Sequence, residues 1–172
     1  YKSVLGNNPS GNERKEALDA LEEIYVNDLN RAGEYVDLAV SLGGVKLENL
    51  YRDSLIYTAA YLTYEKDSLE MAVEQFDAYL DSFPTGYFAV EAHFYRGLSN
   101  LEIKEYKNAY EDFAYVVDLG PGEFFVESCF NAALISFNYT KQFRKALSHY
   151  SALEEVLDND VKKYDAQLGA LR

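Results

Sequence analysis

Few residues in this chain could perform catalysis or bind a metal ion, and they lie far apart in the sequence. The two histidines, His93 and His149, are 56 residues apart (149−93) in different predicted helices, and Cys129 is the one cysteine. A zinc site needs three or four converging donors, and a reactive thiol needs a cationic neighbour. Neither is evident here, so we expect His93 to be a packed imidazole and Cys129 a buried, inert thiol.

Acidic residues are numerous, but they are not arranged for acid or base catalysis. The chain has 29 Asp and Glu against 16 Lys and Arg, a formal net charge of −13. Neighbouring carboxylates such as Glu102 and Glu105 lack the apolar setting that raises a carboxyl pKa for catalysis. We therefore expect no catalytic residue, no metal and no cofactor. We also expect no nucleic-acid partner, because so acidic a chain repels phosphates.

The composition favours a folded domain without membrane insertion. Hydrophobic residues make up 48% of the chain, and no run approaches the roughly 18 consecutive apolar residues of a spanning helix. The sequence starts at Tyr1 and ends at Arg172 in a helical pattern without the polar face of a terminal repeat. We interpret it as part of a longer array, whose missing front end would carry any targeting signal.

A small residue followed four positions later by an aromatic residue occurs three times at one interval. The pairs are Ala72 with Phe76, Ala109 with Phe113, and Ala146 with Tyr150. The interval is 37 residues (109−72 and 146−109), and Pro84 and Pro121 share it. In helical-hairpin repeats the small residue lets two helices approach, the aromatic fills the space between units, and proline ends the second helix. Such hairpins must stack to cover their apolar faces.

Apolar residues at spacings of three and four, separated by short loop signals, predict helices along nearly the whole chain. The predicted helices span residues 12–28, 31–42, 47–65, 68–82, 88–104, 106–119, 124–140, 143–157 and 160–171. We assign residues 1–49 to a degenerate N-terminal hairpin, and 50–172 to three regular hairpins plus a trailing helix over 160–171. The regular hairpins cover about 53–86, 90–123 and 127–158. The predicted fold is a single all-α, right-handed α-solenoid of about four antiparallel hairpins.

The unit from Val90 to Glu123 resembles a tetratricopeptide repeat. The residues in the family's small, aromatic, alanine, aromatic and proline positions are Gly97, Tyr106, Ala109, Phe113 and Pro121. The third unit departs from the pattern at Leu134, where a small residue is expected, and at Asp158, where proline is expected. Residues 83–97, FPTGYFAVEAHFYRG, further resemble tetratricopeptide proteins of the bacterial cell envelope, including those associated with the Tol-Pal system and the lipoprotein of outer-membrane assembly.

The resemblance implies a scaffold that holds a peptide or a partner protein in a concave groove lined by the first helices of the hairpins. The corresponding residues are Tyr57, Tyr61, Tyr64, Phe94, Leu98, Leu101, Asn131, Ile135 and Asn138. We expect a non-catalytic protein–protein interaction with a neutral or basic partner, because the chain is acidic. The resemblance also implies the cell envelope, although a cytoplasmic location stays open.

Three alternatives remain at this point. The tyrosine stripe could serve only for packing between helices, because aromatic stripes more often belong to a core than to a site. A tyrosine-rich groove could bind a carbohydrate or another small molecule. The segment could also regulate a larger enzyme.

Overall fold

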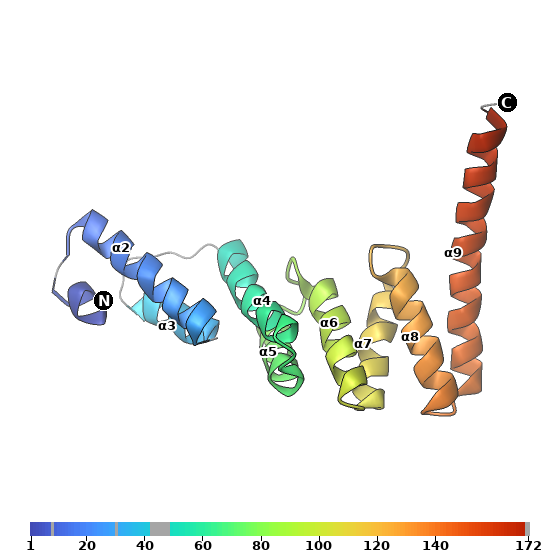
Figure 1. Ribbon diagram of the computed structural model, residues 1–172, viewed down its shortest axis with the longest axis horizontal. Helices are drawn as coiled ribbons and strands as arrows, with labels where there is room; N and C mark the ends of the chain where they lie inside the picture. The colour runs from blue at the N-terminus through green and yellow to red at the C-terminus, as the bar shows by residue number, and fades with distance from the viewer. Residues whose placement is uncertain (8, 30, 42–48, 171–172) are drawn as a thin grey trace. The chain divides into compact units, whose positions relative to one another are not determined.

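The structure is a computed structural model that describes residues 1–7, 9–29, 31–41 and 49–170, and every regular element in those residues is a helix (Figure 1). The all-α class is therefore confirmed. The chain divides into two compact units, Tyr1–Ala92 and His93–Arg172, and helix α6 crosses from one to the other. Within the described ranges, no helix is both long and apolar enough to cross a lipid bilayer.

Unit 1 begins with four helical segments. They are α1 (Lys2–Leu5), α2 (Gly11–Glu22), the π-helical segment η1 (Glu23–Asp28) and α3 (Ala32–Ser41). Helix α2 begins after Ser10 because Ser10 and Glu13 form a capping box, in which the Glu13 carboxylate accepts hydrogen bonds from the Ser10 backbone N–H and hydroxyl at 2.9 and 2.8 Å. These hydrogen bonds lower the pKa of Glu13. The cap fixes the start of α2, whose buried residues join the core of unit 1.

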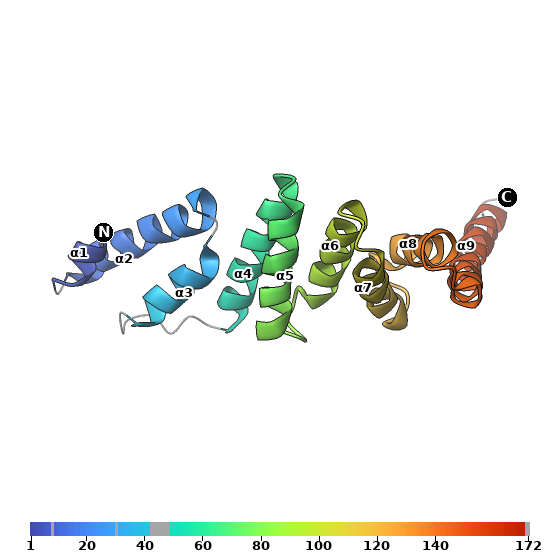
Figure 2. The ribbon, with the colours of Figure 1, turned by 90° about the horizontal axis from the view of Figure 1, so that it is seen from below.

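Helices α4 (Asn49–Glu65) and α5 (Leu69–Ser82) pack side by side as a hairpin in unit 1 (Figure 2). Ala72 and Phe76 of α5 are fully buried. The side of α4 that carries Leu55 and Ala59 joins the core cluster formed with α2, η1 and α3. The hairpin therefore shares its core with the N-terminal helices.

The loop after α5 is held by two polar side chains of the hairpin. Asp53 of α4 accepts hydrogen bonds from the Tyr79 hydroxyl at 2.6 Å and from the Tyr87 backbone N–H at 2.7 Å. The same hydroxyl accepts a hydrogen bond from the Phe88 backbone N–H at 3.1 Å. A Cβ at Gly86 would lie 2.6 Å from this hydroxyl, so only glycine fits there. Burial and the bond to Asp53 raise the pKa of Tyr79, which keeps its proton on the donor.

Unit 2 contains most of α6 (Ala89–Glu102), then α7 (Tyr106–Asp118), α8 (Phe125–Asn138) and α9 (Phe143–Ala170). Helix α8 packs against both α7 and α9. Because α9 has 28 residues and α8 has 14, the second half of α9 extends beyond α8 (Figure 1).

The predicted break between residues 157 and 160 is wrong, because α9 continues through it as one helix to Ala170. Pro84 and Pro121 lie in the turns after α5 and α7, whereas Asp158 occupies the equivalent position after another 37 residues (158−121). An aspartate keeps the backbone N–H that proline lacks and has no ring to clash with the preceding turn. The residue at position 158 therefore does not end this helix.

The N-terminal predictions differ from the structure in smaller ways. The helix predicted over 12–28 changes from α to π geometry at Glu23, and Lys2–Leu5 forms a short helix that the spacing did not predict. The predicted helix ends at residues 42 and 47 lie outside the described residues.

The turns within the hairpins share an unusual backbone conformation at a fixed interval. Asp67, Lys104 and Lys141 have positive φ angles of 59°, 68° and 56°, and they are 37 residues apart (104−67 and 141−104). Left-handed conformations are rare for residues with a side chain, because the Cβ crowds the carbonyl oxygen. The left-handed conformation therefore recurs at the interval found in the sequence.

The first two of these turns are Schellman motifs. Ser68 N–H donates to the Thr63 carbonyl at 3.2 Å, and Asp67 N–H donates to the Tyr64 carbonyl at 2.9 Å. The equivalent bonds after α6 run from Glu105 to Asn100 at 2.7 Å and from Lys104 to Leu101 at 3.1 Å. In the third turn, Gln142 N–H reaches back to the Ser136 carbonyl at 2.7 Å, one residue farther. The third turn is thus wider than the first two.

Burial follows the repeat at the alanine position but not at the aromatic position. Ala72 and Ala109 are 0% exposed and Ala146 is 2% exposed. At the aromatic position, Phe76 and Phe113 are 0% exposed, whereas Tyr150 is 40% exposed. The third hairpin therefore keeps the close helix contact but does not enclose its aromatic ring.

Candidate functional site

The three tyrosines of the predicted groove form a chain of contacting rings along α4. The ring centroids of Tyr57 and Tyr61 are 6.1 Å apart, and those of Tyr61 and Tyr64 are 6.2 Å apart. Tyr57 also stacks on Phe88 at 4.6 Å with an interplanar angle of 4°. All three tyrosines are half-buried. At one end of this tyrosine stripe, Tyr57 packs against Phe88. The stripe then continues along α4 to Tyr64, one turn before Asp67.

The equivalent residues of unit 2 divide between the core and the surface. Phe94 and Ile135 are buried. Leu98, Leu101 and Asn131 are half-buried, and Asn138 at the end of α8 is exposed.

Phe94 packs inside the second hairpin rather than at its surface. Its ring lies 6.1 Å from that of Phe113 in an edge-to-face arrangement and 4.5 Å from that of Phe124. Such contacts stabilise the core by about 0.5–1.5 kcal/mol beyond the area that they bury. Phe94 and Ile135 are core residues in this structure, which leaves Leu98 and Leu101 as the half-exposed apolar members on α6.

A buried carboxylate at Asp112 organises a polar cluster between α6 and α7 that the sequence analysis did not identify. Arg96 donates from Nη2 to Oδ1 at 2.5 Å and from Nε to Oδ2 at 3.0 Å. His93 Nδ1 lies 2.8 Å from Oδ1, and Asn100 Nδ2 donates to Oδ2 at 3.4 Å. The His93 ring also stacks on Tyr115 at 3.9 Å.

The Asp112 cluster is built for holding helices together. Both carboxylate oxygens of Asp112 already accept hydrogen bonds, and the side chain is only 2% exposed, so it is poorly placed to take a proton from a substrate. The guanidinium of Arg96 compensates the buried charge, which would otherwise be costly. The expected packed imidazole at His93 is confirmed, because the ring is half-buried and paired to Asp112.

The repeat itself carries the signal that could have revealed Asp112. Gln75, Asp112 and His149 are spaced by 37 residues (112−75 and 149−112). The Gln75 side-chain oxygen accepts a hydrogen bond from the Thr63 hydroxyl at 2.6 Å. Asp112 likewise accepts a hydrogen bond from Asn100, which is the residue equivalent to Thr63. A polar residue recurring in the interior of an otherwise apolar helix face indicates an internal hydrogen bond.

His149 occupies this polar position in the third hairpin, but its hydrogen-bond partner lies on α7 rather than on the first helix of its own hairpin. Its Nε2 lies 3.2 Å from the Tyr110 hydroxyl, and Lys145 Nζ lies 4.7 Å from the centre of the Tyr110 ring. Burial lowers the pKa of His149, Asp118 opposes this shift, and Lys145 adds to it. The imidazole is therefore held in its neutral form near neutral pH.

Cys129 is fully buried in α8, as the sequence predicts. Burial raises the pKa of the thiol to about 11. A nucleophilic or metal-binding cysteine acts as the thiolate, so this residue behaves as a small apolar side chain.

Two of the hollows in unit 1 are lined by described residues. One of about 190 Å³ is lined mainly by small and apolar side chains of α3, α4 and α5, including Ala32, Ile56, Ala59 and Ala78. The other, of about 340 Å³, is lined by Asp19, Glu22, Glu23, Val26 and Asn27. The acidic lining of the second hollow would favour a cationic group.

In the described part of the chain, no three acidic, histidine or cysteine side chains converge on one point. Comparisons of the chain with protein-family models, curated proteins and solved structures find no match.

Proposed function

We propose that this chain is a tetratricopeptide-like α-solenoid and acts as a scaffold that binds another protein, without a catalytic step of its own. Three features support the repeat: the left-handed turns at Asp67, Lys104 and Lys141, the buried alanines at the same interval, and the matched Thr63–Gln75 and Asn100–Asp112 hydrogen bonds. Stacked hairpins give a rigid surface, so a partner is bound with little ordering cost on the side of the scaffold.

The observation that carries the binding role is the half-exposed tyrosine stripe on α4. Tyrosine presents a flat apolar body and a polar tip, and it is enriched where proteins bind one another. Tyr61 and Tyr64 continue the stripe beyond Tyr57, the member that stacks on Phe88. In unit 1 we assign a ligand-contacting role to Tyr61 and Tyr64 of α4, with Tyr57 as their support. In unit 2 we assign such a role separately to Leu98 and Leu101 of α6.

The proposed ligand is a peptide segment with apolar side chains and a neutral or positive charge. Glu65 follows Tyr64, and Glu102 follows Leu101, and both are exposed. The acidic chain also attracts a basic partner over a distance, which increases the rate of encounter more than the final affinity.

Selection of a random peptide library against the 172-residue chain tests this role. We expect the selected peptides to be rich in apolar and basic residues, and Tyr64→Ala and Leu101→Ala each to weaken their binding about tenfold, the loss of roughly 1.4 kcal/mol. Leu119→Ala serves as the control, because Leu119 is exposed next to the end of α7 and outside the stripe. Peptides that bind all three variants as tightly as the original chain would refute the assignment.

A further inference from the structure

The third hairpin of the chain, which lies in unit 2, exposes a group of large apolar side chains on α8 and α9. Each member is at least 40% exposed, and the group comprises Phe137, Phe143, Leu147, Tyr150 and Leu157. Phe137 and Phe143 contact edge to face at 5.5 Å across the turn between the helices. We call this group the α9 stripe.

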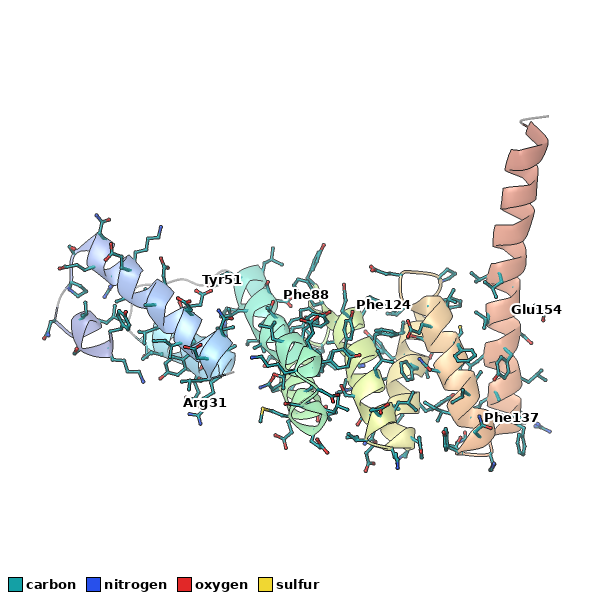
Figure 3. All side chains as sticks on the ribbon, in the orientation of Figure 1. Arg31, Tyr51, Phe88, Phe124, Phe137 and Glu154 are labelled. Carbon is teal, nitrogen blue, oxygen red and sulfur yellow. The ribbon has the colours of Figure 1, made fainter. Side chains whose placement is uncertain are left out.

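The α9 stripe has the spacing of a helix–helix seam. Phe143, Leu147, Tyr150 and Leu157 follow at steps of four, three and seven residues, which place apolar side chains along one line of a helix that packs against another helix. Ala146 and His149 of α9 are buried, so a neighbouring side of the helix already packs in unit 2. Glu154, which falls within the stripe, points away from α8 (Figure 3).

Charges are distributed around the stripe with opposite signs at its two ends. Arg144 lies beside Phe143, and Glu154 and Glu155 lie near Leu157. The described stripe is centred on Tyr150, the midpoint of residues 143 and 157. An antiparallel copy of the same helix, related by a two-fold axis at Tyr150, would bring Arg144 of each chain beside Glu154 and Glu155 of the other. A parallel copy would instead place like charges together.

We propose that a second copy of this chain covers the α9 stripe, and that the two α9 helices pair antiparallel about Tyr150. Phe143 of one copy packs against Leu157 of the other, and the Arg144 guanidinium meets two carboxylates at each end. Such a contact uses the same surface on both chains, as two-fold dimers do. This inference does not depend on the peptide-binding role proposed for α4 and α6.

Sedimentation equilibrium of the 172-residue chain at physiological salt gives the first test. We expect the mass to rise from one to two chains with increasing concentration. Leu147→Asp should remain a monomer throughout, with unchanged helical circular dichroism because Leu147 is 67% exposed. Leu119→Asp, another exposed leucine outside the stripe, should dimerise like the original chain. A chain that stays monomeric, or a dimer that Leu147→Asp does not disrupt, would overturn the proposal.

A charge exchange tests the antiparallel arrangement itself. Arg144→Glu alone should weaken the dimer at least tenfold, and so should the double variant Glu154→Lys and Glu155→Lys, because each then repels its own copy. Mixing the two proteins should restore a one-to-one heterodimer, since each end again pairs opposite charges. Dimers of either variant as stable as the original, or no association on mixing, would exclude this pairing.

Discussion

Two helix pairs of unit 2 use equivalent positions and reach different packing. In the α6–α7 pair, Phe113 is completely buried against Phe94 and Gly97. In the α8–α9 pair, the equivalent Tyr150 is substantially exposed. The alanine position is buried in both pairs, at Ala109 and Ala146, so the close helix contact alone does not decide whether the aromatic ring is enclosed.

The two pairs also differ at the position that faces the aromatic ring in the α6–α7 pair. A Cβ at Gly97 would lie only 3.1 Å from the Phe113 ring, so the ring occupies space that any larger side chain would need. In unit 1 the equivalent residue is Ala60, and Phe76 is again buried. In the third hairpin Leu134 takes this position. Leucine leaves less room for a facing ring than glycine or alanine does, which agrees with the exposure of Tyr150.

The largest expected effect comes from removing the enclosed ring. Phe113→Ala should lower the free energy of unfolding by about 3–5 kcal/mol, because it leaves a cavity in a fully buried site. Tyr150→Ala should cost less than about 1 kcal/mol, because that ring is already in contact with water. Urea unfolding of both variants measures the contrast, and equal losses would show that the two positions are not packed differently.

The polar cluster is the next most sensitive point of the α6–α7 pair. Asp112→Ala removes the partner of Arg96 and His93, and we expect a loss of about 2–3 kcal/mol. The Arg96 side chain is 20% exposed, so water partly solvates the freed guanidinium. Glu111→Ala, which breaks only an exposed pair with Lys107, should cost about 0.5 kcal/mol or less. Urea unfolding that gave similar values for both variants would mean that the buried cluster contributes little.

The left-handed turn offers a stabilising change. Lys104→Gly should raise the free energy of unfolding by about 0.5–1 kcal/mol, because glycine adopts the φ of 68° without the Cβ clash. Glu111→Gly, in the middle of α7, should instead destabilise by about 1 kcal/mol. The melting temperatures of the two variants should therefore shift in opposite directions. A lower melting temperature for Lys104→Gly would contradict the left-handed conformation of residue 104.

The smallest effect is the pH dependence at His149. Burial lowers the pKa of His149 below its ordinary value of 6.5, so the unfolded chain takes up a proton before the folded chain does. The stability that the neutral imidazole contributes is complete above about pH 6.5 and is lost as the pH falls through this value toward the lower folded pKa. The original chain should therefore lose more stability than His149→Gln between about pH 8 and pH 5. Thermal melts that change in parallel would contradict the shift.

Most helices of this chain can be predicted from its sequence, because each carries its own apolar spacing and is bounded by loop residues. Apolar spacing and short loops place α4 to α8 to within a few residues, and the 37-residue interval identifies the buried alanines. The break predicted between residues 157 and 160 is absent from α9, because Asp158 has none of the physical properties that make proline end a helix.

The candidate site was less predictable because burial depends on contacts between helices. Phe94 and Tyr57 occupy equivalent positions 37 residues apart (94−57), but Tyr57 is half-buried whereas Phe94 is buried by Phe113 and Phe124. The Asp112 cluster depends on residues that are 12 to 19 positions apart in sequence. Single-helix periodicity does not report such contacts, whereas comparison of Asp112 with Gln75 across the repeat would have pointed to them.

A double-mutant cycle between Gly97 and Phe113 tests most directly whether the small position controls the aromatic one. Gly97→Leu alone should cost about 1–3 kcal/mol, because the added side chain overfills the site. In the Phe113→Ala background the same change should be neutral or stabilising, because leucine then fills the cavity. An equal cost of Gly97→Leu in both backgrounds would contradict the account.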